Sequence, residues 1–392
     1  MAPSTDDRPI RLAFFDAYAL EEGAGLVLLE LVRRLDRQRF HPVALVPRDG
    51  PLVSLLEAVG CHVDVMEPAA PLNGYGEQLP VAGPLTLCKA ALSLGAYAVR
   101  VAEWLRRSEA EVLHCNQTRA AITAGPGARL AGVPVLWNVR IRERMPRHAV
   151  WLAGACSDTI VPLTACTFRG LAEEERLISR SRIIRNAVDL AQFHPGRDGE
   201  TRAALGIPPD APVILSVGCL VPRKGFDLLI RAMPHVLTQF ASARLLIAGG
   251  NVDGLSDHRS ELEHLARSLG VVGAIRLLGR RDDVPELLRT CDLFALASRH
   301  EGDPASVLEA MATGRPVVVT PAAAPAVEDG INGVVLPEES PEALARAICR
   351  LLADRCLAGR LGASARATVE AHHDINAMVR AYEREWRRLA GR

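Results

Sequence analysis

The sequence has little aromatic content, little lysine and no net charge. Aromatic residues make up 4% of its 392 residues, and 46 Lys and Arg balance 46 Asp and Glu. Nonspecific nucleic-acid binding needs a positive surface, and single strands stack on aromatic side chains, so nucleic acid is excluded as an expected partner. Of the 46 basic residues only Lys89 and Lys224 are lysine, and each retained lysine is therefore a candidate for a specific role.

Three further absences bear on location. The polar residues 1–9 contain no apolar core of a secretory signal, and no apolar run reaches the roughly 20 residues of a membrane span. The nine cysteines are odd in number and include no Cys-x-x-Cys pair, which suits reduced thiols rather than a disulfide framework or a zinc site. We therefore expect a cytoplasmic protein without a transmembrane span.

The basic run 140–147 is typical of a solvated face. Contact with an anionic acceptor or with a membrane surface stays an alternative for this run.

Short apolar runs rich in β-branched residues, such as 10–15 and 213–217, alternate with amphipathic helical patterns along the sequence. This alternation predicts βαβ units and parallel sheets buried on both faces. The twelve predicted strands exceed the usual size of one open sheet, and Pro and Gly interrupt the pattern at 193–212. We predict an α/β fold with two Rossmann-like doubly wound domains facing a central cleft. Their expected bounds are 1–192 and 193–374, followed by a C-terminal helix, 375–392, that crosses back to the N-terminal domain.

The segment 300–312 has the clearest chemical pattern. Asp303 is a good N-cap and Pro304 suits the first helical position, so Glu301 lies in a loop before a helix that contains Glu309. At a rise of about 1.5 Å per residue the two carboxylates lie on the order of 10 Å apart, a spacing that suits an elongated polar ligand. Helix N–H groups favour phosphate, and a carboxylate accepts both hydroxyls of a ribose. An ordinary capped helix with two surface glutamates explains the spacing alone equally well.

Two turns that follow predicted strands also contain candidate ligand-binding residues. Lys224 lies in the turn 217–225, and its ammonium is a compact charge suited to phosphate. The first strand and first helix are joined by Glu-Gly-Ala-Gly at 22–25, where glycine allows a close backbone approach. A solvated basic turn and a plain tight turn are the ordinary alternatives. The sequence contains no Gly-x-x-x-x-Gly-Lys-Ser/Thr loop, no Gly-x-Ser-x-Gly elbow and no Asp-x-Asp clamp for a metal–diphosphate complex.

Taken in order, these segments resemble the retaining GT-B glycosyltransferases of glycosyltransferase family 4. Residues 301–309 match the family's Glu-x7-Glu motif, and Leu-Glu-Ala-Met-Ala surrounds the second glutamate. Residues 184–189 resemble its domain junction, and 279–288 its loop before the motif strand. Residues 328–333 and 341–344 resemble its late landmarks. The resemblance covers nearly the whole chain, and several ordered matches at the right separations make it specific.

The resemblance implies a retaining hexosyltransferase that uses a nucleotide-sugar donor, UDP- or GDP-linked, and needs no metal or other cofactor. The hydroxylated acceptor would be a natural product, a lipid or a glycan. Glu301 and Lys224 would be catalytic, with Glu301 on a hydroxyl of the sugar, Lys224 on the diphosphate and Glu309 on the ribose. The implied donor-binding residues are Gly23, Gly218, Arg223, Lys224, Glu301, Gly302, Asp303 and Glu309. Candidates on the acceptor side are His114, Asn138 and Arg140.

Three positions depart from the family pattern. Cys219 replaces the arginine of Gly-Arg-Leu, a phosphate-binding cation, for which Arg223 is a candidate substitute. The segment 322–326 replaces Gly-Gly-x-Pro-Glu, and the histidine often found after the strand 133–139 is absent. Two alternatives on the same scaffold therefore stay open. One is a catalytically impaired binding or partner subunit, and the other is a sugar-nucleotide epimerase.

Overall fold

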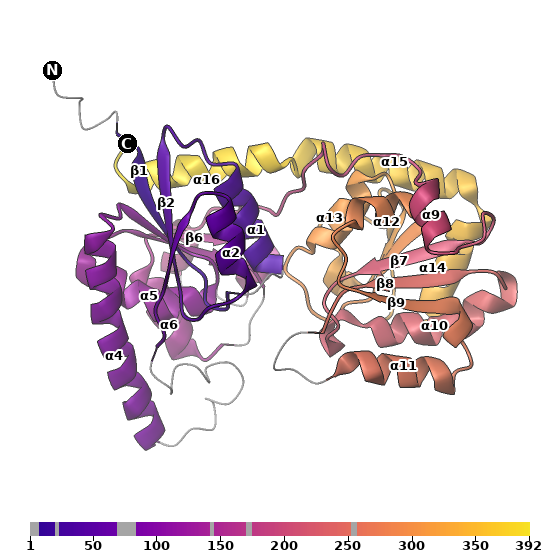
Figure 1. The fold of residues 1–392 in the computed structure, drawn as a ribbon, viewed down its shortest axis with the longest axis horizontal. Helices are drawn as coiled ribbons and strands as arrows, with labels where there is room; N and C mark the ends of the chain where they lie inside the picture. The colour runs from indigo at the N-terminus through magenta and orange to yellow at the C-terminus, as the bar shows by residue number, and fades with distance from the viewer. Residues whose placement is uncertain (1–7, 20–22, 69–83, 142–144, 170–174, 252–256) are drawn as a thin grey trace. The chain divides into compact units, whose positions relative to one another are not determined.

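The computed structural model of the chain describes residues 8–19, 23–68, 84–141, 145–169, 175–251 and 257–392. The chain forms two compact units: unit 1 comprises 1–185 and 376–392, and unit 2 comprises 186–375. Figure 1 labels many of the elements of each unit. The observed boundary lies seven residues before the one placed from the sequence. Residues near Val188 belong to unit 2 because the Val188 N–H donates to the His373 carbonyl over 2.9 Å.

Unit 1 is built on a six-stranded parallel sheet in the order β3-β2-β1-β4-β5-β6. The strands are apolar and largely buried because helices cover both faces, as is usual for parallel sheets. The chain reverses its order between β1 and β4, which makes their carboxyl ends the switch point where such sheets bind ligands. The strands are β1 (Ile10–Phe15), β2 (Phe40–Val46), β3 (His62–Val65), β4 (Val112–Cys115), β5 (Val135–Val139) and β6 (Thr159–Pro162). The helices are α1 (Gly23–Arg33), α2 (Pro51–Ala58), α4 (Pro84–Arg107), α5 (Thr118–Ala131), α6 (Arg147–Cys156), α7 (Ala165–Arg169) and α8 (Glu175–Ser179).

Unit 2 repeats this plan with the strand order β12-β11-β10-β7-β8-β9, so its switch point lies between β7 and β10. Alternate residues of each strand enter different core clusters, one on each face of the sheet. The strands are β7 (Val213–Val217), β8 (Arg244–Ala248), β9 (Ile275–Gly279), β10 (Leu293–Leu296), β11 (Val317–Val319) and β12 (Val334–Val335). The α-helices are α9 (Gly199–Ala204), α10 (Phe226–Gln239), α11 (His258–Ser268), α12 (Val284–Thr290), α13 (Ala305–Ala312), α14 (Pro341–Ala353) and α15 (Arg355–His372), and the 3-10 turns are η2 (Pro222–Lys224), η3 (Val272–Ala274) and η4 (Pro321–Ala323).

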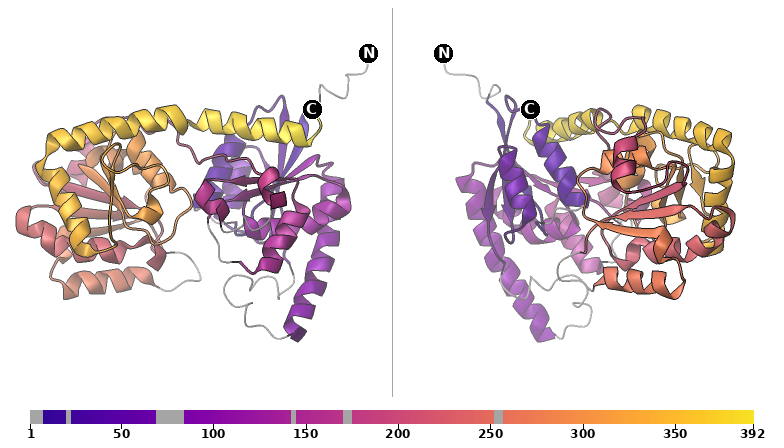
Figure 2. Two further views of the ribbon diagram at one scale, coloured as in Figure 1. Left: turned by 180° about the vertical axis from the view of Figure 1, so that it is seen from behind. Right: turned by 45° about the vertical axis from the view of Figure 1, so that its right-hand side comes forward.

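The last helix, α16 (Ile375–Leu389), packs on the sheet of unit 1, although it follows α15 of unit 2 in the chain. It lies alongside β1 in Figure 1 and in both views of Figure 2. Tyr382 and Trp386 are fully buried. The Trp386 ring meets Phe14 edge-on at 5.8 Å, and the Tyr382 ring lies 5.4 Å from His114. One apolar stripe of α16 thus completes the core of unit 1.

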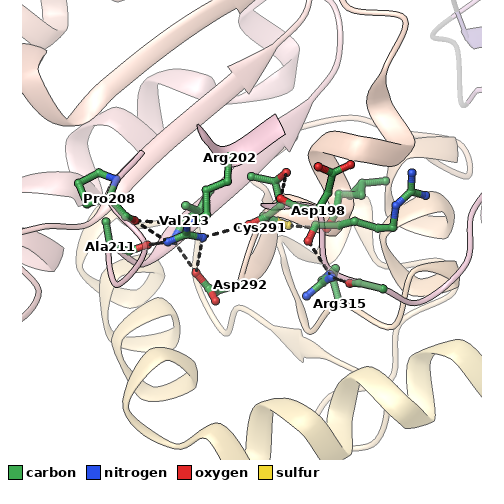
Figure 3. A network of polar contacts seen from close by, with 12 residues as sticks. Asp198, Arg202, Pro208, Ala211, Val213, Cys291, Asp292 and Arg315 are labelled. Carbon is green, nitrogen blue, oxygen red and sulfur yellow. Dashed lines mark hydrogen bonds and ion pairs between the residues drawn. The ribbon is translucent and has the colours of Figure 1, made fainter. Parts of the chain in front are cut away.

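A polar network fastens the segment 193–212 to the sheet of unit 2 (Figure 3). The Arg202 guanidinium donates to the Pro208 carbonyl over 3.1 Å and lies 3.9 Å from the Asp292 carboxylate. That carboxylate accepts from the N–H of Val213, the first residue of β7, over 2.9 Å. The Pro- and Gly-rich pattern that indicates a break between domains therefore belongs to unit 2, at the amino ends of its strands. Within the residues described above, no helix is both long and apolar enough to span a bilayer.

Candidate functional site

The candidate donor site of unit 2 lies where β7 and β10 end. These strands are parallel neighbours, with Leu293 paired to Ile214, so their carboxyl ends reach the same edge of the sheet. The connection after β7 contains η2 with Lys224, and the connection after β10 contains Glu301. The fold thereby brings together two residues that are 77 positions apart in the sequence.

Two glycines allow the η2 turn to approach the sheet edge. Gly225 has φ +67°, and a Cβ there would lie 1.9 Å from the carbonyl oxygen of Ala297. A Cβ at Gly249 would lie 1.8 Å from the carbonyl oxygen of Gly218. Both distances are far inside van der Waals contact, so side chains are excluded at both positions. The turn that carries Lys224 is therefore packed directly against the end of β10.

Glu301 is the centre of an ion cluster. Its Oε1 lies 2.6 Å from Lys224 Nζ and 3.4 Å from Arg223 Nη1, and it accepts from Ser298 Oγ over 2.8 Å. The side chains of Glu301 and Lys224 are only 7% and 10% exposed. Burial raises the pKa of Glu301, but the Lys224 ammonium, the Arg223 guanidinium and the hydrogen bonds outweigh it, so that the pKa lies below its usual value. The carboxylate is thus ionised at neutral pH and paired with two cations.

Arg223 also reaches the position at which the sequence lacks the expected cation. Its Nη2 lies 3.9 Å from the sulfur of Cys219, while its Nη1 faces Glu301. Arg223 therefore supplies a second positive charge beside Lys224 from a different point of the same turn.

Glu309 lies in α13 and is partly exposed. Burial of its carboxyl group by the surrounding protein nevertheless raises the pKa of Glu309 to about 7. The positive charge of the Lys224 ammonium opposes this rise only in part. Lys224 therefore acts electrostatically on both glutamates of the predicted motif. One of them is ionised at neutral pH, and the other titrates there.

The start of α13 differs from the prediction at Asp303. The helix begins at Ala305, with Pro304 rather than Asp303 in the N-cap position. The Asp303 carboxylate instead accepts from the Asn186 N–H over 3.0 Å, and its carbonyl accepts from the Asn186 side-chain amide over 2.6 Å. Asp303 is buried, and its carboxylate and its carbonyl hold Asn186, the first residue of unit 2. Its neighbour Gly302 is buried as well.

The candidates in unit 1 occupy three different environments. Gly23 is exposed at the start of α1. His114 and Asn138 are fully buried in the core beneath α16, where the Asn138 amide donates to the Tyr382 hydroxyl. Burial lowers the pKa of His114 well below its usual value, and nearby Arg140 lowers it further, so the imidazole is neutral. The structure thus places His114 and Asn138 inside the protein rather than on a surface that faces an acceptor.

The third acceptor-side candidate, Arg140, lies at the carboxyl edge of the sheet of unit 1. Its guanidinium donates to Asn116 Oδ1, and Asn116 donates to Asp16 Oδ2 over 2.6 Å. The sequence-based prediction missed Asn116 and Asp16. A signal for both residues is nevertheless present in the sequence. Asn116 is the first polar residue after β4, Asp16 is the first after β1, and these two apolar strands flank the switch point.

Metal binding has no candidate among the described ranges, which contain no group of three or more His, Cys, Asp or Glu side chains arranged to hold an ion.

Known proteins give an independent comparison for the cluster around Lys224. Residues 211–354 match the family model of the group 1 glycosyl transferases. Over these residues the chain is similar to the group 1 glycosyl transferases. The match includes Lys224, Glu301 and Glu309.

Curated relatives show the same similarity over part of their length. The lipopolysaccharide core biosynthesis glycosyltransferase LpsE of Rhizobium meliloti is 37% identical over 183 residues, which are 46% of this chain and 51% of LpsE. The D-inositol 3-phosphate glycosyltransferase of Mycolicibacterium gilvum is 32% identical over 210 residues, 52% of this chain and 46% of that protein. The chain therefore spans about half the length of the curated relatives that it matches.

Solved structures extend the likeness to both units. HepE of Anabaena, determined in complex with UDP and glucose, superposes with a TM-score of 0.79 and 20% sequence identity. The match covers 96% of this chain and 99% of HepE. At this identity the likeness shows the fold alone, and it confirms the predicted GT-B class of two Rossmann-like units.

Proposed function

We propose that the protein is a retaining glycosyltransferase that moves a sugar from a nucleotide-diphosphate sugar to an acceptor hydroxyl. Unit 2 would hold the donor and unit 1 the acceptor. The observation that carries the proposal is the buried cluster of Lys224, Arg223 and Glu301 at the switch point of unit 2, within the residues that match the family model. The proposal is supported by relatives that are named as glycosyltransferases and by HepE, which binds UDP and glucose.

The cluster is suited to a reaction whose leaving group is a diphosphate. The bond between the anomeric carbon and the diphosphate oxygen breaks, and the acceptor oxygen forms a bond to that carbon on the same face. The acceptor proton passes to the departing phosphate oxygen, so that atoms and charge balance. The Lys224 ammonium and the Arg223 guanidinium stabilise the negative charge that develops on the diphosphate, which is the type of stabilisation that contributes most to such reactions.

The two glutamates would orient the donor. Glu301 accepts a hydrogen bond from a hydroxyl of the transferred sugar, and Glu309 accepts from the ribose hydroxyls. In the structure Glu301 is paired with Lys224 and Arg223. When the diphosphate binds, it pairs with Lys224 and Arg223 in place of Glu301. The Glu301 carboxylate then accepts a hydrogen bond from the hydroxyl of the transferred sugar. In the metal-independent reaction that we propose, these two side chains supply positive charge to the diphosphate.

The first experiment identifies the donor. UDP-, GDP-, ADP- and TDP-linked hexoses are screened by thermal shift, because a ligand that binds only the native state raises the melting temperature. The stabilising donor is then incubated with hydroxylated acceptors with and without EDTA, and the anomeric configuration of the product is read by NMR. We expect transfer with retained configuration and no loss in EDTA. An inverted product, or activity only with added metal, would contradict the proposed mechanism.

One observation favours a second function, a binding or partner subunit without its own activity. It is Cys219, which stands where the family pattern has a phosphate-binding arginine. The same screen separates the two functions, since a partner subunit would show transfer only when a second chain is added. A reaction with the donor alone serves as a control that would reveal an epimerase.

A further inference from the structure

The outer side of α4 exposes apolar side chains. The opposite side of this 24-residue helix packs on α5, and Val101 and Leu105 on that side are fully buried in the core of unit 1 (Figure 1). On the outer side Leu92 and Val99 are 76% and 52% exposed, and Ala96 between them is exposed as well. Leu92 and Ala96 also line a shallow apolar hollow of about 640 Å³. Exposed apolar surface of this kind indicates a contact with a partner.

These residues belong to one line along the helix, which we call the α4 seam. It consists of Lys89, Leu92, Ala96, Val99 and Glu103, all of them exposed. Intervals that alternate between three and four residues bring side chains onto one face of a helix, and this spacing is typical of helices that pair with another helix. At the centre Ala96 is small, and no described atom beyond the adjacent part of α4 lies within 4 Å of the position that a Cβ on Gly95 would take. A second helix can therefore approach α4 closely at this point.

The α4 seam is complementary to its own reverse. Lys89 and Glu103 each lie seven residues from Ala96, which is about 10.5 Å along the helix axis. When two α4 helices pair antiparallel with Ala96 at the centre, Lys89 of each copy therefore faces Glu103 of the other. Leu92 of one copy lies at almost the same height as Val99 of the other, so the apolar residues meet between the two ion pairs. A parallel pair would instead place like charges opposite each other at both positions.

Glu103 remains available for a second cation. Its carboxylate lies 3.4 Å from Arg107 in the same helix, but 53% of its side chain is exposed. Because an exposed ion pair of this kind is weak, the carboxylate can also bind Lys89 of a second copy at little cost. A membrane surface is the other common partner of an exposed apolar helix face, but anionic lipids repel Glu103. The charges of the α4 seam thus favour a second copy of this chain.

We propose that two copies of this protein associate through the α4 seam, as an antiparallel helix pair with its two-fold axis at Ala96. Both copies use the same surface, and such closed two-fold contacts are the commonest in homo-oligomers. Because the contact comprises one helix from each copy, we expect a reversible dimer with a dissociation constant on the order of 10 µM. Lys89, one of the two lysines of the chain, thereby gains a specific role. The α4 seam contains none of the residues around Glu301, so the proposal does not depend on the proposed function and assigns no catalytic role to the dimer.

Charge reversal at the two ends of the α4 seam tests this pairing. Analytical ultracentrifugation of the full chain from about 1 to 200 µM measures the dissociation constant. Lys89→Glu places two carboxylates opposite each other at both ends of the pair, and Glu103→Lys places two ammonium groups there. Each variant alone should dimerise about tenfold more weakly than the wild type. The double variant Lys89→Glu with Glu103→Lys restores opposite charges, so its dissociation constant should return to within about threefold of the wild-type value.

Two further measurements examine the same contact. An equimolar mixture of the two single charge variants should dimerise again, because each copy supplies the charge that the other lacks. Ala96→Glu places two carboxylates on the two-fold axis and should leave only monomer over the same concentration range. Ala155→Glu is the matched control, because Ala155 is an exposed alanine of α6 in unit 1, and this variant should dimerise like the wild type. Melting temperatures close to that of the wild type verify that each variant is folded.

Three results would overturn the proposal. The first is a wild type that stays monomeric up to about 200 µM, and the second is a pair of single charge variants that dimerise as well as the wild type. The third comes from cosedimentation with vesicles of phosphatidylcholine and phosphatidylglycerol. A monomer that binds these vesicles, and loses this binding in Ala96→Glu, would assign the apolar face of α4 to a membrane instead of a second copy.

Discussion

The two units use the switch points of their sheets in opposite ways. In unit 2 the ends of β7 and β10 contain an ion cluster in which Glu301 faces Lys224 and Arg223. In unit 1 the ends of β1 and β4 contain an amide-centred network in which Asn116 satisfies side chain and backbone together. Ionic partners can be exchanged for those of a charged ligand, whereas an amide network fixed to the backbone holds one geometry. The comparison suggests that unit 2 binds by exchange of ionic partners and that unit 1 acts through a preformed shape.

The largest expected effect comes from removing the ammonium of unit 2. We expect Lys224→Ala to reduce kcat/KM by about 30- to 1,000-fold, which corresponds to about 2 to 4 kcal/mol, since the diphosphate loses its main counter-charge and Glu301 loses its closest partner. Steady-state kinetics with the donor found by the screen measure this loss. Lys89→Ala is the matched control, because Lys89 is the other lysine of the chain and is exposed on α4. Equal activity of the two variants would contradict the proposal that the Lys224 ammonium stabilises the charge of the diphosphate.

The second prediction concerns the pH dependence of donor binding at Glu309. Because burial raises the pKa of Glu309 to about 7, the carboxyl is mostly protonated at pH 6 and mostly ionised at pH 8. Only the ionised form accepts both ribose hydroxyls, so donor affinity should rise roughly tenfold from pH 6 to pH 8. Calorimetry with a nucleotide sugar measures this rise. In Glu309→Gln the rise should disappear, whereas Glu342→Gln, at an exposed position of α14, should keep it.

The third prediction tests the buried core beneath the edge of unit 1. The folded-state pKa of His114 lies well below its unfolded value of about 6.5, because the buried imidazole is held neutral. Above pH 6.5 both states are neutral and His114 adds no pH dependence. As the pH falls below 6.5 the unfolded state takes up a proton first, so stability is lost, by about 1 to 2 kcal/mol at pH 5.

Urea unfolding of the wild type and of His114→Phe at pH 7.5 and pH 5 isolates this contribution. The phenylalanine fills a similar volume among Phe14, Tyr382 and Trp386 but does not titrate. The fall in stability between the two pH values should therefore be smaller in the variant. Equal falls in both proteins would show that His114 is protonated without penalty in the folded state.

The smallest effect is expected at Cys219. Since Arg223 already supplies the second cation, Cys219→Arg should change donor affinity by less than about threefold. In an Arg223→Ala background the same substitution should recover most of an approximately tenfold loss. Donor binding of the two single variants and the double variant forms the cycle that checks this. A large gain from Cys219→Arg alone would mean that Arg223 is not the substitute cation.

Sequence periodicity predicted the fold class and most strands, because buried parallel strands leave an unmistakable apolar pattern. The strands over 10–15 and 213–217 have the predicted bounds. The errors have physical causes. The Pro- and Gly-rich segment 193–212 has the composition of a linker, but Arg202 ties it to the sheet through carbonyls and Asp292.

The candidate site could be predicted only where its residues belong to a local pattern. Glu301 and Glu309 share one motif and Lys224 stands out by its rarity, so the sequence identified all three. The side-chain contacts between residues distant in the sequence could not be predicted, because they depend on which strands become neighbours in the sheet. Asn116 and Asp16 are 100 positions apart, and neither has a motif of its own. In the local sequence pattern Asp303 has the position of a helix cap. Its actual partner, Asn186, is 117 positions away and therefore lies outside that pattern.

The path of α16 has a consequence for the order in which the protein acquires its structure during synthesis. Phe14 lies in the first strand of unit 1, yet Tyr382 and Trp386, which cover Phe14 and His114, are translated about 370 positions later than Phe14. While unit 2 is being translated, the nascent first unit therefore carries an uncovered aromatic surface, and such surfaces invite aggregation. Chaperone dependence is expected to centre on this interval and to end when α16 docks.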